Sequence, residues 1–188
     1  MVKGQTFTLE AVITALLLLL VVYITIQAIP LTPLTPSTAN IIVENNLEAY
    51  AGDVLTALIY EKETEPSMLK KALLNWTCRA IYGGASSDDY NQSFSDPSNA
   101  IDLREVLINA FEKKGLAYNI ELYYNDTLSL RKLTFIFNGY PSRNAVTITQ
   151  IIPIYDSDPD DGVKICIPDM DDSNLYNVLY VKLTVWRM

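Results

Sequence analysis

The strongest pattern in the chain is an apolar run near its start: the nineteen residues from Ala11 to Ile29 carry no charge. At ~1.5 Å of rise per residue, a helix of this run is roughly 28 Å long, close to the ~30 Å hydrocarbon thickness of a bilayer. The pattern therefore predicts a transmembrane or stem helix over residues 5–29.

Charge near this run predicts its orientation. Lys3 precedes the run, and the other Lys and Arg residues follow it in a long region where charge does not control translocation. Lys3 alone favours a cytoplasmic N-terminus before processing. We therefore expect a single-pass membrane protein whose residues 40–188 form an extracellular domain.

Proline then recurs every third residue, at Pro30, Pro33 and Pro36. Because proline cannot donate a backbone hydrogen bond and restricts the residue before it, residues 30–39 are predicted to be an extended linker. Over residues 40–62 apolar positions recur every three or four residues, which predicts a helix packed on a core.

Two further helices are expected. The first covers residues 66–76, and the second begins with Asn99 and Asp102 as a capping pair and ends at Gly115. Between them, residues 83–98 are rich in Gly, Ser, Asp and Asn, which predicts a surface loop.

Beyond this point the apolar positions alternate, which is typical of strands. The predicted strands cover residues 118–124, 133–137, 146–155 and 177–186. Short connections favour antiparallel neighbours, and helices are needed to cover the apolar face of such a sheet. The sequence thus predicts an α+β protein: an N-terminal transmembrane helix, a helical segment and a C-terminal antiparallel β-sheet head domain.

Composition excludes several functions. The net charge of -8 argues against nucleic acid as a partner, because phosphates would be repelled. The chain has no histidine, which removes the usual general base and the usual zinc ligand. No carboxylates converge with a nucleophile along the sequence, so we predict that the chain is not an enzyme and has no cofactor unless it binds calcium.

Two cysteines, Cys78 and Cys166, lie far apart on the side expected to face an oxidising environment. One disulfide between them is the simplest prediction, and two buried free thiols are the alternative. Three Asn-x-Ser/Thr triplets, at Asn75, Asn91 and Asn125, are candidate glycosylation sites, although chance alone supplies one or two such triplets.

An acidic loop follows the third predicted strand. Its carboxylates alternate along the chain as they do in calcium loops, at Asp156, Asp158, Asp160 and Asp161. The glycine comes one residue late for an EF-hand, and Pro159 interrupts the pattern. A solvated acidic loop is therefore favoured over a weak calcium site.

The start of the chain resembles the leader of archaeal type IV pilin-like proteins. Lys3, Gly4 and the polar run to Glu10 directly precede the apolar helix. The resemblance implies a class III-type signal peptide, residues 1–4, that prepilin peptidase removes between Gly4 and Gln5. It also implies that Glu10 pairs with the new amine on Gln5 of a neighbouring subunit; the alternative is that Glu10 lies in the membrane interface of an isolated anchor.

A wider resemblance links the chain to an uncharacterised group of archaeal membrane-anchored surface proteins. It rests on the leader, the Pro-Leu-Thr stretch, and segments 115–119, 141–147 and 175–188. Together these resemblances imply a structural subunit or minor component of a type IV filament or secretion assembly, with pilin-like subunits or copies of itself as partners. The alternative is a monomeric membrane-anchored surface protein that binds a polysaccharide, an S-layer or a protein through outward-facing tyrosines.

Overall fold

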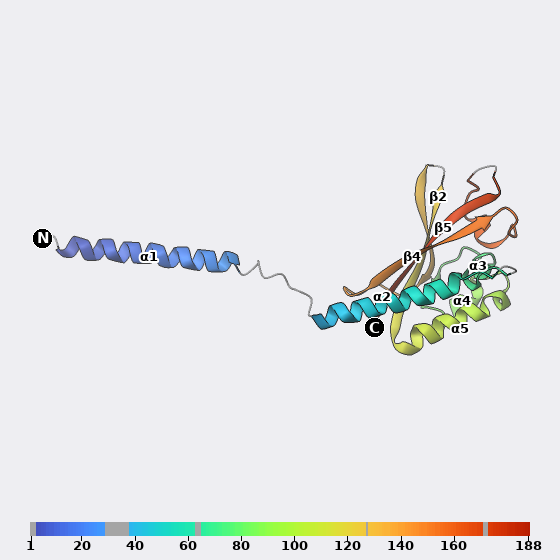
Figure 1. The fold of residues 1–188 in the computed structure, drawn as a ribbon, viewed down its shortest axis with the longest axis horizontal. Coiled ribbons are helices and arrows are strands. Elements are labelled where there is room, and N and C mark those ends of the chain that lie inside the picture. Colours follow the sequence, from blue (N-terminus) through green and yellow to red (C-terminus); the bar gives the residue numbers. More distant parts are fainter. Residues whose placement is uncertain (1–2, 29–37, 63–64, 127, 171–172) are drawn as a thin grey trace. The chain divides into compact units, whose positions relative to one another are not determined.

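The computed structural model describes residues 3–28, 38–62, 65–126, 128–170 and 173–188 (Figure 1). The chain divides between Ile41 and Ile42 into two compact units. The first contains helix α1 (Lys3–Ala28) and the start of helix α2 (Thr38–Ile59), and the second contains the rest of α2, the sheet and the remaining helices.

Helix α1 overlaps the predicted transmembrane segment, but it corrects that prediction. Two threonine hydroxyls within it bond to the preceding turn, Thr14 to the Glu10 carbonyl oxygen at 2.8 Å and Thr25 to that of Val21 at 2.7 Å. Among the described residues, no helix has the length and apolar character needed to cross a membrane, so the predicted transmembrane helix is wrong.

Residues 30–37 of the predicted proline-rich linker lie outside the described residues. The last two predicted linker residues, 38 and 39, belong to helix α2. α2 covers Thr38–Ile59, beginning and ending slightly before the predicted 40–62. It buries residues spaced three or four apart: Leu47, Ala51, Leu55 and Leu58. The Tyr50 hydroxyl donates to the Ala110 carbonyl oxygen at 2.8 Å, which ties α2 to helix α5.

The segment between α2 and the main sheet differs from prediction in two ways. It contains helix α3 (Met68–Leu73), strand β1 (Ile81–Tyr82), helix α4 (Asp88–Gln92) and helix α5 (Ile101–Ala110). The predicted surface loop thus includes a helix, and its two large apolar residues, Tyr90 and Phe94, are buried. The expected cap at Asn99 is also wrong: Asp96 accepts from the Ser98 amide at 3.0 Å and caps a short 3₁₀ turn before α5.

The sheet has five strands in the order β1-β3-β2-β5-β4. The four long strands are β2 (Leu116–Asp126), β3 (Ser129–Phe137), β4 (Val146–Tyr155) and β5 (Leu175–Arg187). Their pairings are antiparallel, but β1 pairs in parallel with β3, so the sheet is mixed and the purely antiparallel prediction is wrong.

Strand order also differs from the expectation that consecutive strands are neighbours. β4 follows β3 in the chain but pairs with β5. β5 lies between β2 and β4, and its alternating residues Leu179, Val181, Leu183 and Val185 are fully buried. β4 is consequently an edge strand.

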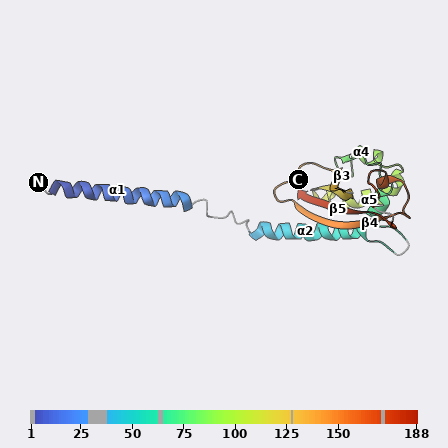
Figure 2. The same cartoon turned by 90° about the horizontal axis from the view of Figure 1, so that it is seen from above.

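One face of the sheet forms the core. Tyr118, Ile120 and Leu122 of β2 join the buried residues of β5 and of the helices in a single apolar cluster. Figure 2 shows α2 running alongside β4 and β5. The alternate residues of the strands face away from this cluster, and several of them are exposed.

Candidate functional site

Helix α1 exposes apolar side chains around its whole circumference. The large apolar residues from Val12 to Ile24 are each 44–65% exposed. The large apolar residues are consecutive from Leu16 to Ile24. Since successive residues of a helix point about 100° apart, this stretch has no polar face. An apolar surface of this kind needs cover from other molecules, because helices that are hydrophobic all round are normally buried.

The residues expected for processing and assembly lie at the start of this helix. Gly4 and Gln5 are in the first turn of α1, so the predicted cleavage bond is in helical backbone. Glu10 follows on the same helix, and it is exposed. Glu10 lies roughly 7.5 Å along the helix axis from Gln5. The pairing of Glu10 with Gln5 of a neighbouring subunit stays a prediction.

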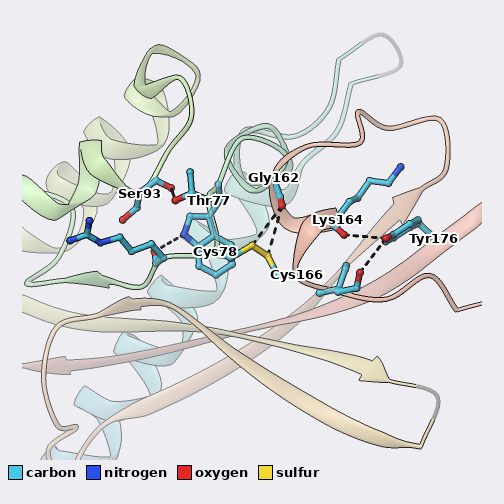
Figure 3. Close-up of a disulfide and its surroundings, with 10 residues drawn as sticks. Thr77, Cys78, Ser93, Gly162, Lys164, Cys166 and Tyr176 are labelled. Carbon is cyan, nitrogen blue, oxygen red and sulfur yellow. Dashed lines mark hydrogen bonds between the residues drawn. A yellow bond between two sulfur atoms is a disulfide. The ribbon is translucent and has the colours of Figure 1, made fainter.

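Cys78 and Cys166 form a disulfide in the second unit (Figure 3). Their Cα atoms are 6.3 Å apart, and 88 positions separate them in the sequence. Cys78 follows α3 and has a left-handed backbone, φ +62°. The bond therefore connects the helical segment to the 3₁₀ turn Gly162–Ile165 just before β5.

The same junction depends on a close backbone approach at Gly162. Its carbonyl oxygen lies 3.7 Å from the Cys78 sulfur and 3.8 Å from that of Cys166. A Cβ atom on Gly162 would lie only 2.2 Å from the carbonyl carbon of Leu74, and φ is +67°. Only glycine fits this position, because both the space and the backbone angle exclude a side chain.

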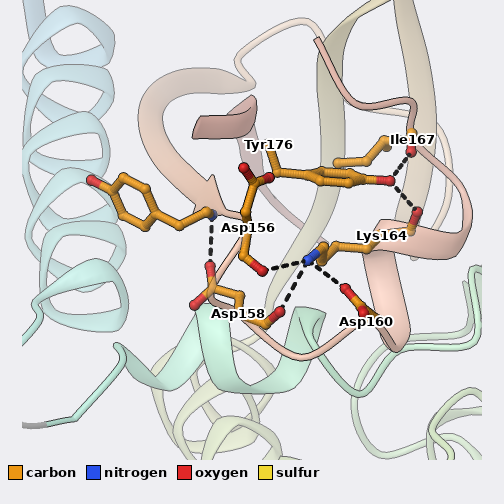
Figure 4. Close-up of polar contacts among 7 residues, drawn as sticks. Asp156, Asp158, Asp160, Lys164, Ile167 and Tyr176 are labelled. Carbon is orange, nitrogen blue, oxygen red and sulfur yellow. Dashed lines mark hydrogen bonds and ion pairs between the residues drawn. The ribbon is translucent and has the colours of Figure 1, made fainter. Parts of the chain in front are cut away.

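The predicted calcium loop is organised around a buried lysine, Lys164 (Figure 4). Its side chain is 4% exposed. The ammonium nitrogen donates to the carbonyl oxygens of Asp156 at 3.2 Å and Asp158 at 3.0 Å, and to Asp160 Oδ1 at 2.8 Å. An intramolecular cation thus lies within the acidic loop and pairs with one of its predicted ligands, Asp160.

A second buried lysine, Lys70 of α3, holds the loop from the other side. Its Nζ lies 3.1 Å from Asp158 Oδ2 and 3.8 Å from Glu61 Oε1. The same Asp158 oxygen accepts from the Tyr155 amide at 2.8 Å. Asp158 is thereby fixed between β4 and α3.

The remaining predicted ligand, Asp161, is exposed and makes no capping hydrogen bond to the turn after it. Within the described ranges, no three cysteine, aspartate or glutamate side chains come together to hold a metal ion. Calcium binding stays a prediction. The sequence signal for this lysine was a single basic residue three positions after the acidic run ends at Asp161.

Tyr176 completes this junction. Its hydroxyl donates to the carbonyl oxygens of Lys164 at 3.1 Å and Ile167 at 3.2 Å, and its ring centroid lies 4.6 Å from the Lys164 nitrogen. Burial, with the nearby negative charge of Asp169, raises the pKa of Tyr176, so the phenol stays protonated and keeps its donor. The loop, the turn and β5 are therefore fixed together.

The three glycosylation candidates differ in surroundings. The side-chain amide of Asn75 donates to the Asp96 carbonyl oxygen and accepts from the Asp96 N–H, so both of its polar atoms are already hydrogen-bonded. Asn91 is exposed on α4, and its side chain accepts from Arg104 at 3.4 Å. Asn125 is exposed near the end of β2, but Thr127 of its triplet lies outside the described residues. Asn91 and Asn125 thus remain the accessible candidates.

The outward face of the sheet carries a charged group that sequence reasoning missed. Glu121 accepts hydrogen bonds from Lys132 at 3.0 Å and from the Tyr123 hydroxyl at 3.1 Å, and Lys182 lies 3.4 Å away. Burial acts to raise the pKa of Glu121, but these hydrogen bonds and positive charges outweigh burial and lower it. Beside this group Tyr123, Tyr180 and Ile151 are aligned across three strands.

Comparison with known proteins places the chain in a family. The model of a family of unknown function, DUF7288, matches residues 3–185. The chain belongs to this family. An uncharacterized protein from Archaeoglobus fulgidus is 27% identical to this DUF7288 chain over 186 residues, which cover 98% of the chain and 92% of that protein. This relative supports the archaeal part of the resemblance. No solved structure matches the DUF7288 chain.

Proposed function

We propose that this DUF7288 chain is a structural subunit, or a minor component, of an archaeal type IV filament or secretion assembly at the cell surface. In this proposal α1 packs against α1 of pilin-like subunits or of other copies, and the second unit is displayed outward. Prepilin peptidase is the proposed processing partner.

The observation that carries this proposal is the exposed apolar circumference of α1. A helix with one apolar stripe needs one neighbour, whereas a helix that is apolar on all sides needs neighbours all round it. A filament core of packed helices supplies them. Several hundred Å² of exposed apolar surface is unusual on a monomer, so self-assembly is the economical explanation.

Two other features support an extracellular structural role. Disulfides persist in oxidising environments, and the Cys78–Cys166 bond is of the kind found outside the cytosol. The chain lacks histidine, and its net charge of -8 is suited to solubility rather than to nucleic-acid binding. A displayed, non-enzymatic domain fits these properties.

The second candidate is a surface protein that binds a polysaccharide, an S-layer or a protein partner as a monomer. The aligned side chains of Tyr123, Tyr180 and Ile151 on the outward face of the sheet favour it. Tyrosine rings present an apolar body with a polar tip, which suits sugar or protein contacts. This candidate requires neither leader cleavage nor packing of α1.

Mass spectrometry of the native N-terminus separates the two candidates. In protein purified from a host that has prepilin peptidase, we expect the chain to begin at Gln5, because the pilin route requires the cut after Gly4. The same protein from a host without the peptidase is the control and should keep Lys3 and Gly4. Retention of these residues in both hosts would favour the monomeric candidate.

Replacing Glu10 by alanine tests the assembly role. Losing a charge partner for the Gln5 amine in a dry helix interface is expected to reduce assembly by about tenfold or more. Assembly is measured by electron microscopy and sedimentation of cell-surface material. Glu48→Ala is the matched control, because Glu48 is also an exposed helical acid but lies in α2. Normal filaments from Glu10→Ala would contradict the pairing role.

A further inference from the structure

Strand β4 (Val146–Tyr155) presents an open edge of the sheet. It pairs with β5 on one side, and no described strand pairs with its other side. An edge strand offers a row of unpaired N–H and C=O groups that another strand can bind. At about 3.4 Å per residue, ten residues of β4 make this row roughly 34 Å long.

The two edges of the sheet are protected differently. β1 covers β3 only at Ile136 and Phe137, and the uncovered part of β3 carries two adjacent charges, Arg131 and Lys132. Charged residues of this kind are the usual protection against strand pairing. β4 has no charged residue, although the other three long strands all have at least one.

Several side chains of β4 are exposed to solvent as well as uncharged. Thr147, Thr149 and Ile151 are exposed, and they share one face of the strand because side chains alternate. Pro153 lacks an N–H and interrupts the edge only toward its end. The stretch from Val146 to Ile152 is therefore free to accept a strand.

Charges at the two ends of β4 are opposite in sign. Arg143, three residues before the strand, is exposed and has no carboxylate within 4.0 Å in the described part of the chain. Asp156 and Asp160, just after the strand, are exposed. In an antiparallel pair of identical strands, the basic end of each strand meets the acidic end of the other.

We propose that a second copy of this chain binds edge to edge along β4, antiparallel and about a two-fold axis, so that one sheet continues through both copies. A pairing centred on Gln150 sets Arg143 opposite Ser157 of the second copy, between Asp156 and Asp160. The uncharged strip lets two chains of net charge -8 approach, and the charged ends fix the direction. This contact does not involve α1, so it is independent of the proposed filament role.

Cysteine cross-linking of the whole chain in mild detergent tests the proposal. The added thiol is the single free one, because both native cysteines are bonded. Variants Thr147→Cys, Thr149→Cys and Ile151→Cys are mixed in pairs, oxidised, and examined on non-reducing gels. We expect covalent dimers mainly from Thr149→Cys mixed with Ile151→Cys, because a pairing centred on Gln150 places these two residues opposite each other.

Lys132→Cys is the matched control, because it lies on the same outward face but on β3. It should give little dimer. Dimers from Lys132→Cys as abundant as those from β4, equal yields from every pair of β4 variants, or no β4 dimers at all would each overturn the proposal.

Charge exchange checks the direction of pairing. Arg143→Glu, introduced into both partners, should lower the yield of the dimer between Thr149→Cys and Ile151→Cys by about fivefold, because two symmetric contacts become repulsive. Adding Asp156→Arg to that variant should restore the yield. An unchanged yield in Arg143→Glu, or no recovery in the double variant, would overturn the antiparallel arrangement.

Discussion

Replacing Gly162 by alanine is expected to lower the free energy of unfolding by about 3 kcal/mol or more. The added Cβ would lie 2.2 Å from the Leu74 carbonyl carbon, 2.3 Å from its oxygen and 2.6 Å from the Leu73 carbonyl oxygen. These are backbone atoms at the end of α3, so relief requires movement of the helix. The positive φ of +67° adds backbone strain for any residue with a Cβ.

Urea unfolding of the whole chain, followed by tryptophan fluorescence, measures this effect. Trp76 and Trp186 are both buried in the second unit, so the signal reports unfolding there. Gly52→Ala is the matched control: Gly52 lies within α2 with nothing within 4 Å of an added Cβ, and alanine should stabilise that helix by roughly 0.5–1 kcal/mol. A loss below about 1 kcal/mol in Gly162→Ala would show that the close approach relaxes easily.

Removing the disulfide is expected to cost about 4.5 kcal/mol, because it closes a long loop and so restricts the unfolded chain. The bond joins residues 88 positions apart. The variant Cys78→Gly with Cys166→Ala removes it without adding a polar group. Glycine also suits the left-handed backbone at this position, where φ is +62°.

Urea unfolding of the wild-type chain and of the double variant, each with and without a reducing agent, measures this effect. Reductant should lower the unfolding midpoint of the wild-type chain and leave that of the double variant unchanged. The double variant should be less stable than the oxidised wild type under both conditions. Equal responses of the two proteins to reductant would contradict a stabilising role for the bond.

Local pattern predicted most individual elements of the second unit. The alternation in β2 and β5 placed Tyr118, Ile120 and Leu183 on the buried face, where they lie. Gly115 ends the helical segment with a left-handed backbone, φ +69°, as its position after a basic turn predicted. These features depend on residues close in sequence, so spacing and residue type suffice to find them.

The candidate site was predicted only in part, because its parts come from distant segments. The sequence singled out the acidic loop and both cysteines but missed Lys164 and Lys70, which pair with Asp160 and Asp158 of that loop from two different elements. Burial of Tyr90 likewise contradicts the polar composition around it. Composition over a short window does not report which distant groups reach it.

By itself, the sequence determined the helical and alternating periods, the glycine stop at Gly115, the acidity and the absence of histidine. Tertiary structure alone decided the strand order, the parallel pairing of β1, the edge position of β4 and the lysine in the acidic loop. It also corrected the reading of the apolar run as a membrane-crossing helix. The physical reason is the separation in sequence of the residues involved. Periodicity depends on neighbouring residues, whereas strand pairing and charge compensation depend on which surfaces, distant in sequence, are buried together.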